Sequence, residues 1–261
     1  FALIVPGRFM DVRQIQRLFT AAPSGVESQI RINFSMVLNL LLSHTPAMVE
    51  EMLQRSFAAF RMGRTRLHPA SPARLWHDFL RHLEFLRRKG YVNDKDELTE
   101  DGKWASQLRV DQPLLIAEGF RAGVFPRSDP VLLAAIVAVF VNEKETDERL
   151  DRKRLPKVLT QRYRRTAAAL TPFIGEMQAA GFEDRALYLK PAAVMHAWAG
   201  GQSWESVVST AEMEEGDLAM LILRTADNLR HIRDLARVFP EAAASAARAI
   251  ELILRDPVME P

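Results

Sequence analysis

The sequence predicts a mainly α-helical protein in which a winged-helix module is followed by a helical bundle. Apolar residues recur at helical spacing from Val26 onward. A capping residue stands directly before a proline at Thr45-Pro46 and at Asp129-Pro130, a pattern typical of helix starts. One stretch, residues 91–98, breaks the helical rhythm and has the composition of a short hairpin. With 261 residues, 48% of them hydrophobic, the chain is long enough to bury a large core.

The chain begins with a short apolar run, Phe1 to Val5, which ends at Pro6-Gly7. The run is shorter than a secretory signal and lacks its basic leader. We therefore expect it to be the last strand of a domain that begins upstream, which would make this chain a fragment.

We expect residues 28–110 to form the winged-helix module. The helix that starts at Thr45-Pro46 places four apolar residues on one face, Val49, Leu53, Phe57 and Phe60. Residues 61–72 follow, with several basic residues and two prolines but no apolar period. We expect a loop or a truncated insertion near residues 61–75.

The second half of this segment has the order of elements found in a winged helix. The segment Leu80 to Gly90 predicts a helix that ends at a glycine. Tyr91-Val92 and Glu97-Leu98 then predict a short hairpin, and Thr99 is placed to cap another short helix. A helix, a small hairpin and a second helix are the order of a winged helix.

Residues 111–261 predict the helical bundle. The run Val131 to Val141 is apolar on every side, which is typical of a central buried helix. Pro156 starts a long basic helix, Lys157 to Gly181, which we expect Pro172 to kink. This helix carries a basic cluster that we interpret as solvated surface, with contact to a nucleic-acid strand as the alternative: Arg162, Arg164 and Arg165.

Several kinds of chemistry are missing from the sequence. It contains no cysteine, no phosphate-binding loop of the G-x-x-x-x-G-K-[ST] type and no G-x-G-x-x-G motif. Its six histidines lack the spacing of metal ligands. We therefore expect no catalytic residue, no metal and no cofactor in this chain, no contact with a membrane, and a location in the cytoplasm. The net charge of +2 means that any binding of nucleic acid depends on a local arrangement of charges.

Three segments carry longer motifs. In residues 29–60, a run of the form apolar-R-apolar-x-F-x-M-V-LNL precedes S-F-x-x-F. In residues 83–121, GY precedes a short Gly-x-x-Ala stretch and then a predicted helix that contains LLxxE. In residues 190–232, WA-x-G precedes EGDL. In this order the segments resemble the region after the second motor domain in superkiller/exosome-type helicases of superfamily two, which are DEAD/DEAH-box RNA helicases. The C-terminal part of that region is called the DSHCT domain. The matching residues are Arg31, Met36, Asn39, Leu40, Ser56, Phe57, Phe60, Gly90, Tyr91, Gly102, Ala105, Glu118, Trp198, Ala199, Gly201, Glu215, Gly216, Asp217 and Leu218.

This resemblance implies a role within a larger machine. Residues 1–27 resemble the end of the second motor (RecA-like) domain, and ATP and magnesium would bind in motor domains upstream of this chain. The expected partners are single-stranded RNA, with DNA as the alternative, the motor domains in cis, and proteins of RNA degradation. Eukaryotic members carry an arch insertion before the second segment. Only residues 61–75 separate Phe60 from Trp76 here, so the arch is absent, as in bacterial-like members.

The resemblance also implies that the helix from Gly216 to Val238 is the ratchet helix, which lies along the nucleic-acid channel. Helical spacing places one apolar set on a single face, which we expect to be buried: Leu218, Leu221, Ile222, Thr225, Leu229 and Ile232. Arginines at the margins of the other face suit phosphates, and apolar side chains suit base faces. We predict that this face binds nucleic acid through Met220, Leu223, Arg224, Asp227, Arg230, His231 and Arg237. The chain departs from the family at Met220, where many relatives carry a basic residue.

Other interpretations stay open at the level of sequence. The same face also fits a solvated surface on which Asp227 pairs with Arg224 and Arg230. We expect Trp198 and Trp204 to pack the join between two helices, with stacking on bases as the alternative. The whole chain also fits a winged-helix DNA-binding regulator with a helical sensor domain, or an all-helical scaffold for protein interactions. A phosphate loop and a DE-x-[DH] box upstream of Phe1 would exclude the regulator.

Overall fold

The computed structural model describes residues 30–57, 72–110, 112–141, 150, 153, 155–183 and 186–259. Across these residues the protein is mainly helical, with eleven helices, as the sequence predicts. The expected end of a motor domain, residues 1–27, and most of the expected truncated insertion near residues 61–75 lie outside the described residues.

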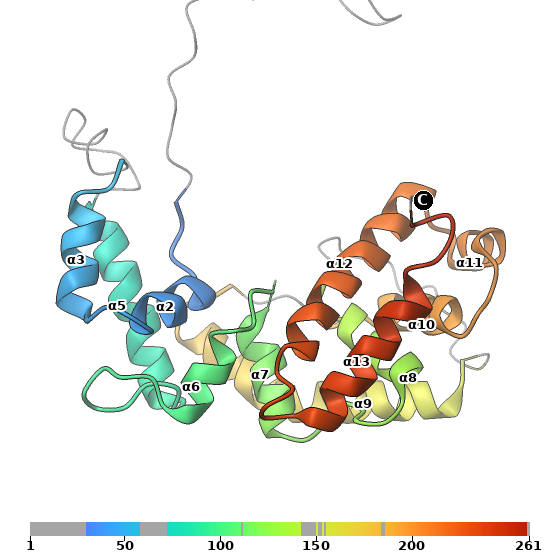
Figure 1. Ribbon diagram of the computed structural model, residues 1–261, viewed down its shortest axis with the longest axis horizontal. Coiled ribbons are helices and arrows are strands. Elements are labelled where there is room, and N and C mark those ends of the chain that lie inside the picture. Colours follow the sequence, from blue (N-terminus) through green and yellow to red (C-terminus); the bar gives the residue numbers. More distant parts are fainter. Residues whose placement is uncertain are drawn as a thin grey trace, which may run out of the picture.

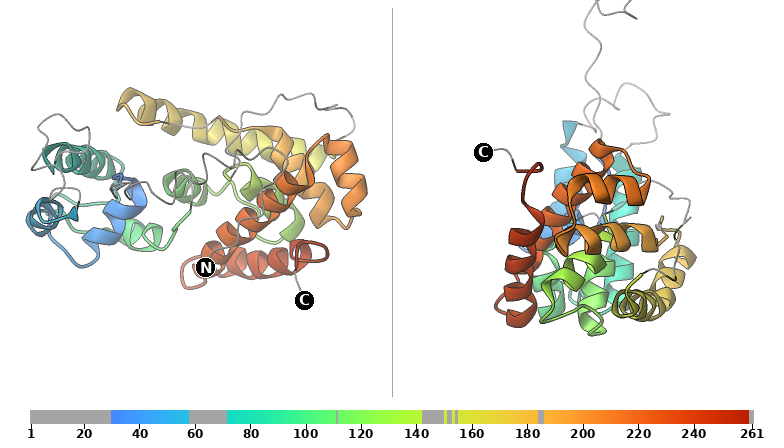
Figure 2. Two further views of the ribbon diagram at one scale, coloured as in Figure 1. Left: turned by 90° about the horizontal axis from the view of Figure 1, so that it is seen from above. Right: turned by 90° about the vertical axis from the view of Figure 1, so that its right-hand side faces the viewer.

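The helices form two groups that lie side by side along the molecule (Figure 1). We call the first group the N-terminal module; it consists of α2 (Phe34–Leu41), α3 (Pro46–Gln54), α5 (Pro72–Arg88) and α6 (Glu100–Ala105). The second group is the bundle; it consists of α8 (Pro130–Ala138), α10 (Leu189–Ala199), α11 (Trp204–Ala211), α12 (Glu215–Arg233) and α13 (Pro240–Ile253). Helix α7 (Pro113–Arg121) lies between the two groups, and the long helix α9 (Lys157–Ala179) runs from the bundle toward the module (Figure 2).

The predicted helix starts are confirmed. The side chains of Thr45, Thr99 and Asp129 each accept a hydrogen bond from a backbone N–H in the first turn of α3, α6 and α8. The prediction that Phe57 lies on the same helical face as Val49 and Leu53 is wrong, because α3 ends at Gln54 and Phe57 lies beyond it, 49% exposed. Phe60 lies outside the described residues.

Helix α8 is the centre of the bundle, as its sequence predicts. Every residue from Leu132 to Val141 is buried, and α8 packs against α9, α10, α12 and α13. An element apolar on all sides has to be surrounded by others, because each exposed apolar face would remain in contact with water. Neighbouring helices of the bundle therefore pack around α8 and cover its apolar surface.

The predicted hairpin is reduced to a single antiparallel bridge, which joins Val92 to Leu98. Gly90 and Asp96 both adopt a positive φ, of 75° and 65°, which turns the chain into and out of this short connection. Helix α5, the bridge and α6 occur in the predicted order. The assignment as a winged helix and the domain boundary near residue 110 remain predictions.

The carboxyl end of α9 connects the module to the bundle. Phe182, just after α9, packs against Phe34, His82 and Phe85 in the core of the module. Glu176 Oε2 pairs with Lys89 Nζ at 2.7 Å. Aromatic packing and an ion pair thus attach α9 to the module, and packing against α8 and α10 attaches it to the bundle. The two groups therefore share one continuous core.

Candidate nucleic-acid interface

Helix α12 is anchored by a face that is buried along its whole length. All six residues predicted for this face are buried, and α12 packs against α8 and α13: Leu218, Leu221, Ile222, Thr225, Leu229 and Ile232. Acidic residues in the first turn of α12 and basic residues in its last turn match the helix dipole. The opposite face is therefore held on a firmly packed helix.

The opposite face of α12 is open to solvent. Met220 and Leu223 are 55% and 43% exposed. Asp227 and Arg230 are also exposed. Arg224 and His231 lie at the margin and are partly buried. Since residues three and four apart share one side of a helix, the structure brings six of the seven predicted residues together on one side of α12. We call this surface the α12 face; it consists of Met220, Leu223, Arg224, Asp227, Arg230 and His231.

The seventh predicted residue, Arg237, lies beyond α12. The prediction that the helix extends to Val238 is wrong, because α12 ends at Arg233. Leu235 is buried, and its carbonyl accepts hydrogen bonds from the N–H groups of Val238 and Phe239, which bends the chain into a turn. Arg237 is exposed on this turn, next to the end of the α12 face.

The α12 face carries an ion pair of the kind expected of a solvated surface. Arg230 Nη1 lies 3.7 Å from Asp227 Oδ1, and both side chains are about half exposed or more. Exposed pairs of this kind contribute about 0–1 kcal/mol to stability. Among the described residues, the side chains of His231 and Arg237 make no ion pair or hydrogen bond. The charged side chains of the α12 face therefore contribute little to the stability of the fold.

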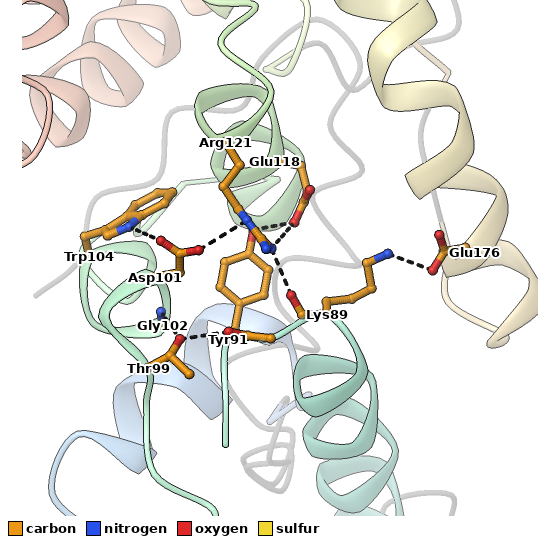
Figure 3. Close-up of polar contacts among 10 residues, drawn as sticks. Lys89, Tyr91, Thr99, Asp101, Gly102, Trp104, Glu118, Arg121 and Glu176 are labelled. Carbon is orange, nitrogen blue, oxygen red and sulfur yellow. Dashed lines mark hydrogen bonds and ion pairs between the residues drawn. The ribbon is translucent and has the colours of Figure 1, made fainter. Parts of the chain in front are cut away.

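A second group of polar and charged side chains connects the residues just after α5 with α6 and α7, and the sequence did not predict it (Figure 3). Glu118 Oε1 accepts a hydrogen bond from Tyr91 Oη at 2.7 Å and another from Arg121 Nη1 at 2.8 Å. Arg121 Nη1 also donates to the backbone carbonyl of Lys89, and Arg121 Nε lies 3.2 Å from Asp101 Oδ2. We call Tyr91, Asp101, Glu118 and Arg121 the polar joint.

The polar joint requires a glycine at position 102. A Cβ atom on Gly102 would lie 2.1 Å from the backbone oxygen of Tyr91. Thr99 Oγ1 accepts a hydrogen bond from the Gly102 N–H at 3.1 Å and donates to the Gly90 carbonyl at 2.8 Å. The close approach of α6 to the residues after α5 is therefore part of what places Tyr91.

Burial and the neighbouring Glu118 carboxylate raise the pKa of Tyr91 well above its ordinary value. Tyr91 is fully buried, so its hydroxyl remains protonated and donates to Glu118. Tyr91, Gly102 and Glu118 all belong to the sequence motifs, yet helical periodicity cannot show that residues this far apart in the chain meet. The polar joint positions the module against α7, and through α7 against the rest of the molecule.

The two tryptophans of the third motif segment pack inside the bundle, as predicted. Trp198 is fully buried, and its ring meets that of Trp204 edge to face at 5.7 Å. Trp198 Nε1 donates to the carbonyl of Ile253 at 2.8 Å, and the Arg255 guanidinium lies over the ring. Trp198 therefore presents no face to a base.

The described part of the chain offers no arrangement typical of a metal site. No group of three or more histidine, aspartate or glutamate side chains in the described ranges is placed to hold a metal ion. None of the described helices combines the length and the apolar composition needed to cross a bilayer. Of the basic cluster on α9, Arg164 and Arg165 are exposed, and Arg162 donates to the carbonyl of Val124 at 3.3 Å.

Comparison with protein families gives a match over most of the chain. The model of the DSHCT (NUC185) domain matches residues 95–260, which include α6 to α13. The matched region contains the whole of the α12 face and three residues of the polar joint, Asp101, Glu118 and Arg121. Tyr91 lies just before it.

Individual relatives are similar over shorter stretches. The DExH-box ATP-dependent RNA helicase DExH15 chloroplastic of Arabidopsis thaliana is 40% identical over 67 residues, which are 26% of this chain and 6% of that protein. Superkiller complex protein 2 of Mus musculus is 28% identical over 114 residues, 43% of this chain and 9% of that protein. The ATP-dependent RNA helicase mtr4 of Schizosaccharomyces pombe is 26% identical over 160 residues, 59% of this chain and 14% of that protein. The chain thus spans a small part of each relative, and the resemblance to superkiller/exosome-type helicases is confirmed.

Proposed function

Since this chain belongs to the DSHCT (NUC185) domain family, we propose that it is the part of an ATP-dependent RNA helicase that holds single-stranded RNA. Two of its relatives are named as ATP-dependent RNA helicases, and a third is named as a superkiller complex protein. In this proposal the strand lies along the α12 face while motor domains elsewhere in the protein hydrolyse ATP. Holding the strand between steps would prevent it from slipping back.

The observation that supports this proposal most directly is the division of α12 into two faces. One face is wholly buried, and the other exposes Met220 and Leu223 beside Arg230. Apolar side chains can rest against bases, and guanidinium groups can pair with phosphates or stack on bases, without selecting a sequence. A helicase needs such tolerance, because every nucleotide of a strand passes the same surface.

The remaining parts of the chain take supporting roles in this proposal. The N-terminal module acts as a winged helix that links the motor domains to the bundle. The polar joint holds this module in a fixed position against α7. ATP and magnesium bind in the motor domains, and proteins of RNA degradation receive the emerging strand. We expect this work to take place in the cytoplasm.

The proposal is tested by measuring the binding of a fluorescently labelled single-stranded RNA across a range of salt concentrations. Arg230→Ala/Arg237→Ala should weaken binding about tenfold or more at low salt, since each arginine contributes a charged contact. It should also reduce the slope of log K against log salt by about 1.4, or about 0.7 for each phosphate that no longer has its arginine. A labelled DNA of the same sequence measures the preference for RNA.

Helix α9 provides a matched control. Arg164→Ala/Arg165→Ala removes the same charge from exposed positions of α9, which packs against α7, α8 and α10. We expect this variant to bind like the wild type. Equal losses in both variants would show that binding follows net charge, and unchanged binding in the Arg230/Arg237 variant would contradict the proposal.

A further inference from the structure

A cavity of about 380 Å³ opens where the turn between α12 and α13 meets the connection between α7 and α8. In Figure 1 this region lies at the lower side of the bundle. The cavity is lined by residues of these two connections and of the adjoining helix ends, among them Phe120, Phe125, Arg127, Val238, Phe239 and Glu241. Its volume falls in the range of small-ligand sites, which is roughly 300–1,000 Å³.

Aromatic rings form the floor of this cavity. The Phe120 ring lies 4.7 Å from the rings of both Phe125 and Phe239, measured between centroids, with the planes tilted by about 30°. Trp104 supports Phe239 edge to face, at 5.1 Å. The ring of Phe125 packs so closely on Gly119 that a Cβ there would lie 2.4 Å from it. Phe120 and Phe125 are themselves buried, so the ring of this floor that is open to a ligand is that of Phe239, held in place by the others.

The rim of the cavity carries one cation and one anion that do not neutralise each other. Arg127 and Glu241 are both exposed, and neither makes an ion pair or a side-chain hydrogen bond with another described residue. The terminal Nη2 of Arg127 lies 3.9 Å from the position of a Cβ on Gly123, so the guanidinium folds back over the α7–α8 connection. An aromatic floor, a guanidinium and a carboxylate thus surround one small volume.

We propose that this cavity binds one nucleotide unit. The base lies against the partly exposed Phe239 ring, which the buried Phe120 ring supports. Its phosphate pairs with Arg127, and Glu241 accepts a hydrogen bond from an exocyclic amino group. Adenine, guanine and cytosine carry such an amino group, whereas uracil does not, so the site should favour the first three. Base stacking on an aromatic ring and a phosphate on an arginine are the two contacts that single-stranded nucleic acid uses most widely.

The position of the cavity connects it with the α12 face, and the proposal rests on the function proposed above. Val238 on the rim follows Arg237 directly, and Arg237 lies just beyond the end of α12. A strand that runs along α12 toward its carboxyl end would reach the cavity over the exposed turn. One nucleotide inserted there would fix the register of the strand, which contacts along α12 alone cannot do. The same chemistry also fits a free mononucleotide.

Methyl NMR signals can report separately on the cavity and on the α12 face in the 261-residue chain. Val238 and Ala242 line the cavity, and Met220 and Leu223 lie on the α12 face. We expect a single-stranded oligo(A) to shift the methyl NMR signals of all four residues. Arg127→Ala should abolish the shifts of Val238 and Ala242 and weaken the binding of oligo(A) about threefold, while Met220 and Leu223 still respond. Arg248→Ala, a substitution on α13 outside the cavity lining, is the matched control and should behave like the wild type.

The outcomes separate this proposal from the function proposed for α12. Shifts at Met220 and Leu223 without shifts at Val238 and Ala242 would overturn the nucleotide site and leave the α12 face standing. Shifts confined to Val238 and Ala242 would support the nucleotide site and contradict the role of α12. A titration with AMP distinguishes the two sources: saturation of the cavity signals by AMP as readily as by oligo(A) would identify a free nucleotide as the ligand. Equal binding of oligo(U) and oligo(A) would contradict the contact to Glu241.

Discussion

The polar joint and the α12 face use the same kinds of side chain in opposite ways. In the joint, Arg121 contacts two carboxylates and a backbone carbonyl, and Tyr91 behind it is fully buried. On the α12 face, Arg230 has one carboxylate at 3.7 Å, and its neighbours Met220 and Leu223 are exposed. Both regions combine arginine and carboxylate groups, but only the joint uses most of their hydrogen-bonding capacity within the protein.

This difference separates structural from binding roles. A buried polar group without a partner costs free energy, so a network such as the joint has to be nearly complete. An exposed arginine has no such requirement, and its donors remain available to a ligand. Changes in the joint should therefore alter stability, and changes on the α12 face should alter binding.

The largest effect on stability is expected for Gly102→Ala. The added Cβ would meet the backbone oxygen of Tyr91 at 2.1 Å, so α6 or the residues after α5 have to move. We expect the free energy of unfolding to fall by about 3 kcal/mol or more, as measured by chemical denaturation. The control is Gly175→Ala in α9, where nothing lies within 4 Å and the helical backbone favours alanine by about 1 kcal/mol. If both substitutions were tolerated equally, the close approach at Gly102 would not be needed for folding.

A smaller loss of stability is expected for Tyr91→Phe, which removes one hydrogen bond and leaves the ring in place. A hydrogen bond to a charged group contributes about 1.5–3 kcal/mol, and Tyr91 Oη donates to the Glu118 carboxylate. Denaturation of Tyr91→Phe, Glu118→Gln and the double variant gives the coupling between the two residues. Strictly additive losses would show that Tyr91 and Glu118 act independently and would contradict the description of a joint.

The stability of the module should also depend on pH. Burial lowers the pKa of His82 from its ordinary value of 6.5, and the ring packs edge to face against Phe34 and Phe182. His82 therefore binds a proton more readily in the unfolded chain than in the folded protein. The free energy of unfolding should decrease as the pH falls below about 6.5, and it should stop decreasing once the pH is below the pKa of His82 in the folded protein. The contribution of one group cannot exceed about 1.4 kcal/mol per pH unit.

Thermal unfolding at pH 7 and at pH 5 tests this effect. We expect His82→Phe to lose less stability between these values than the wild type, and Arg230→Ala to lose as much as the wild type. His196, whose pKa is also lowered by burial, remains in both variants and contributes with the same sign. An unchanged pH response in His82→Phe would assign the acid sensitivity to other groups.

The sequence predicted those parts of the fold that depend on neighbouring residues. Caps at Thr45, Thr99 and Asp129 and the periodicity of α12 arise within one or two helical turns, and each is present in the structure. The end of α12 was misplaced, because the helix stops at Arg233 and the chain then turns, with the Leu235 carbonyl accepting hydrogen bonds from the N–H groups of Val238 and Phe239. Phe57 was misplaced because α3 ends at Gln54, so helical spacing no longer decides which side of the helix Phe57 occupies.

The polar joint and the cavity could not be predicted from periodicity. Tyr91 and Glu118 are 27 residues apart in the chain, and the floor of the cavity brings Phe120 against Phe239, which lies still farther away in the chain. The candidate α12 face was predictable, because a single helix carries it. Sequence patterns thus identify surfaces made by one element more readily than sites made by several.

We expect the smallest change in stability for Asp227→Asn on the α12 face. This substitution tests whether a carboxylate on the α12 face affects binding and not stability, in contrast to the polar joint. Asp227 is 61% exposed and pairs with Arg230 at 3.7 Å, so its loss should change the free energy of unfolding by less than about 0.5 kcal/mol. Binding should respond in the opposite direction from the arginine variants. Removal of a negative charge that competes with phosphate for Arg230 should strengthen the binding of single-stranded RNA roughly two- to fivefold at low salt.

A weaker binding of RNA by Asp227→Asn would assign a different role to this carboxylate. Asp227 would then accept a hydrogen bond from a ribose 2′-hydroxyl or a base amino group, and its loss would outweigh the gain in charge. Binding of RNA and of DNA with the same sequence separates these contacts, because only a contact to the 2′-hydroxyl makes the loss specific to RNA. In the polar joint, by contrast, removal of a carboxylate leaves Arg121 partly buried without a full set of partners, so the same substitution there should lower stability. One exchange of aspartate for asparagine, made at Asp101 and at Asp227, therefore distinguishes a charge that holds the protein together from one that is open to a ligand.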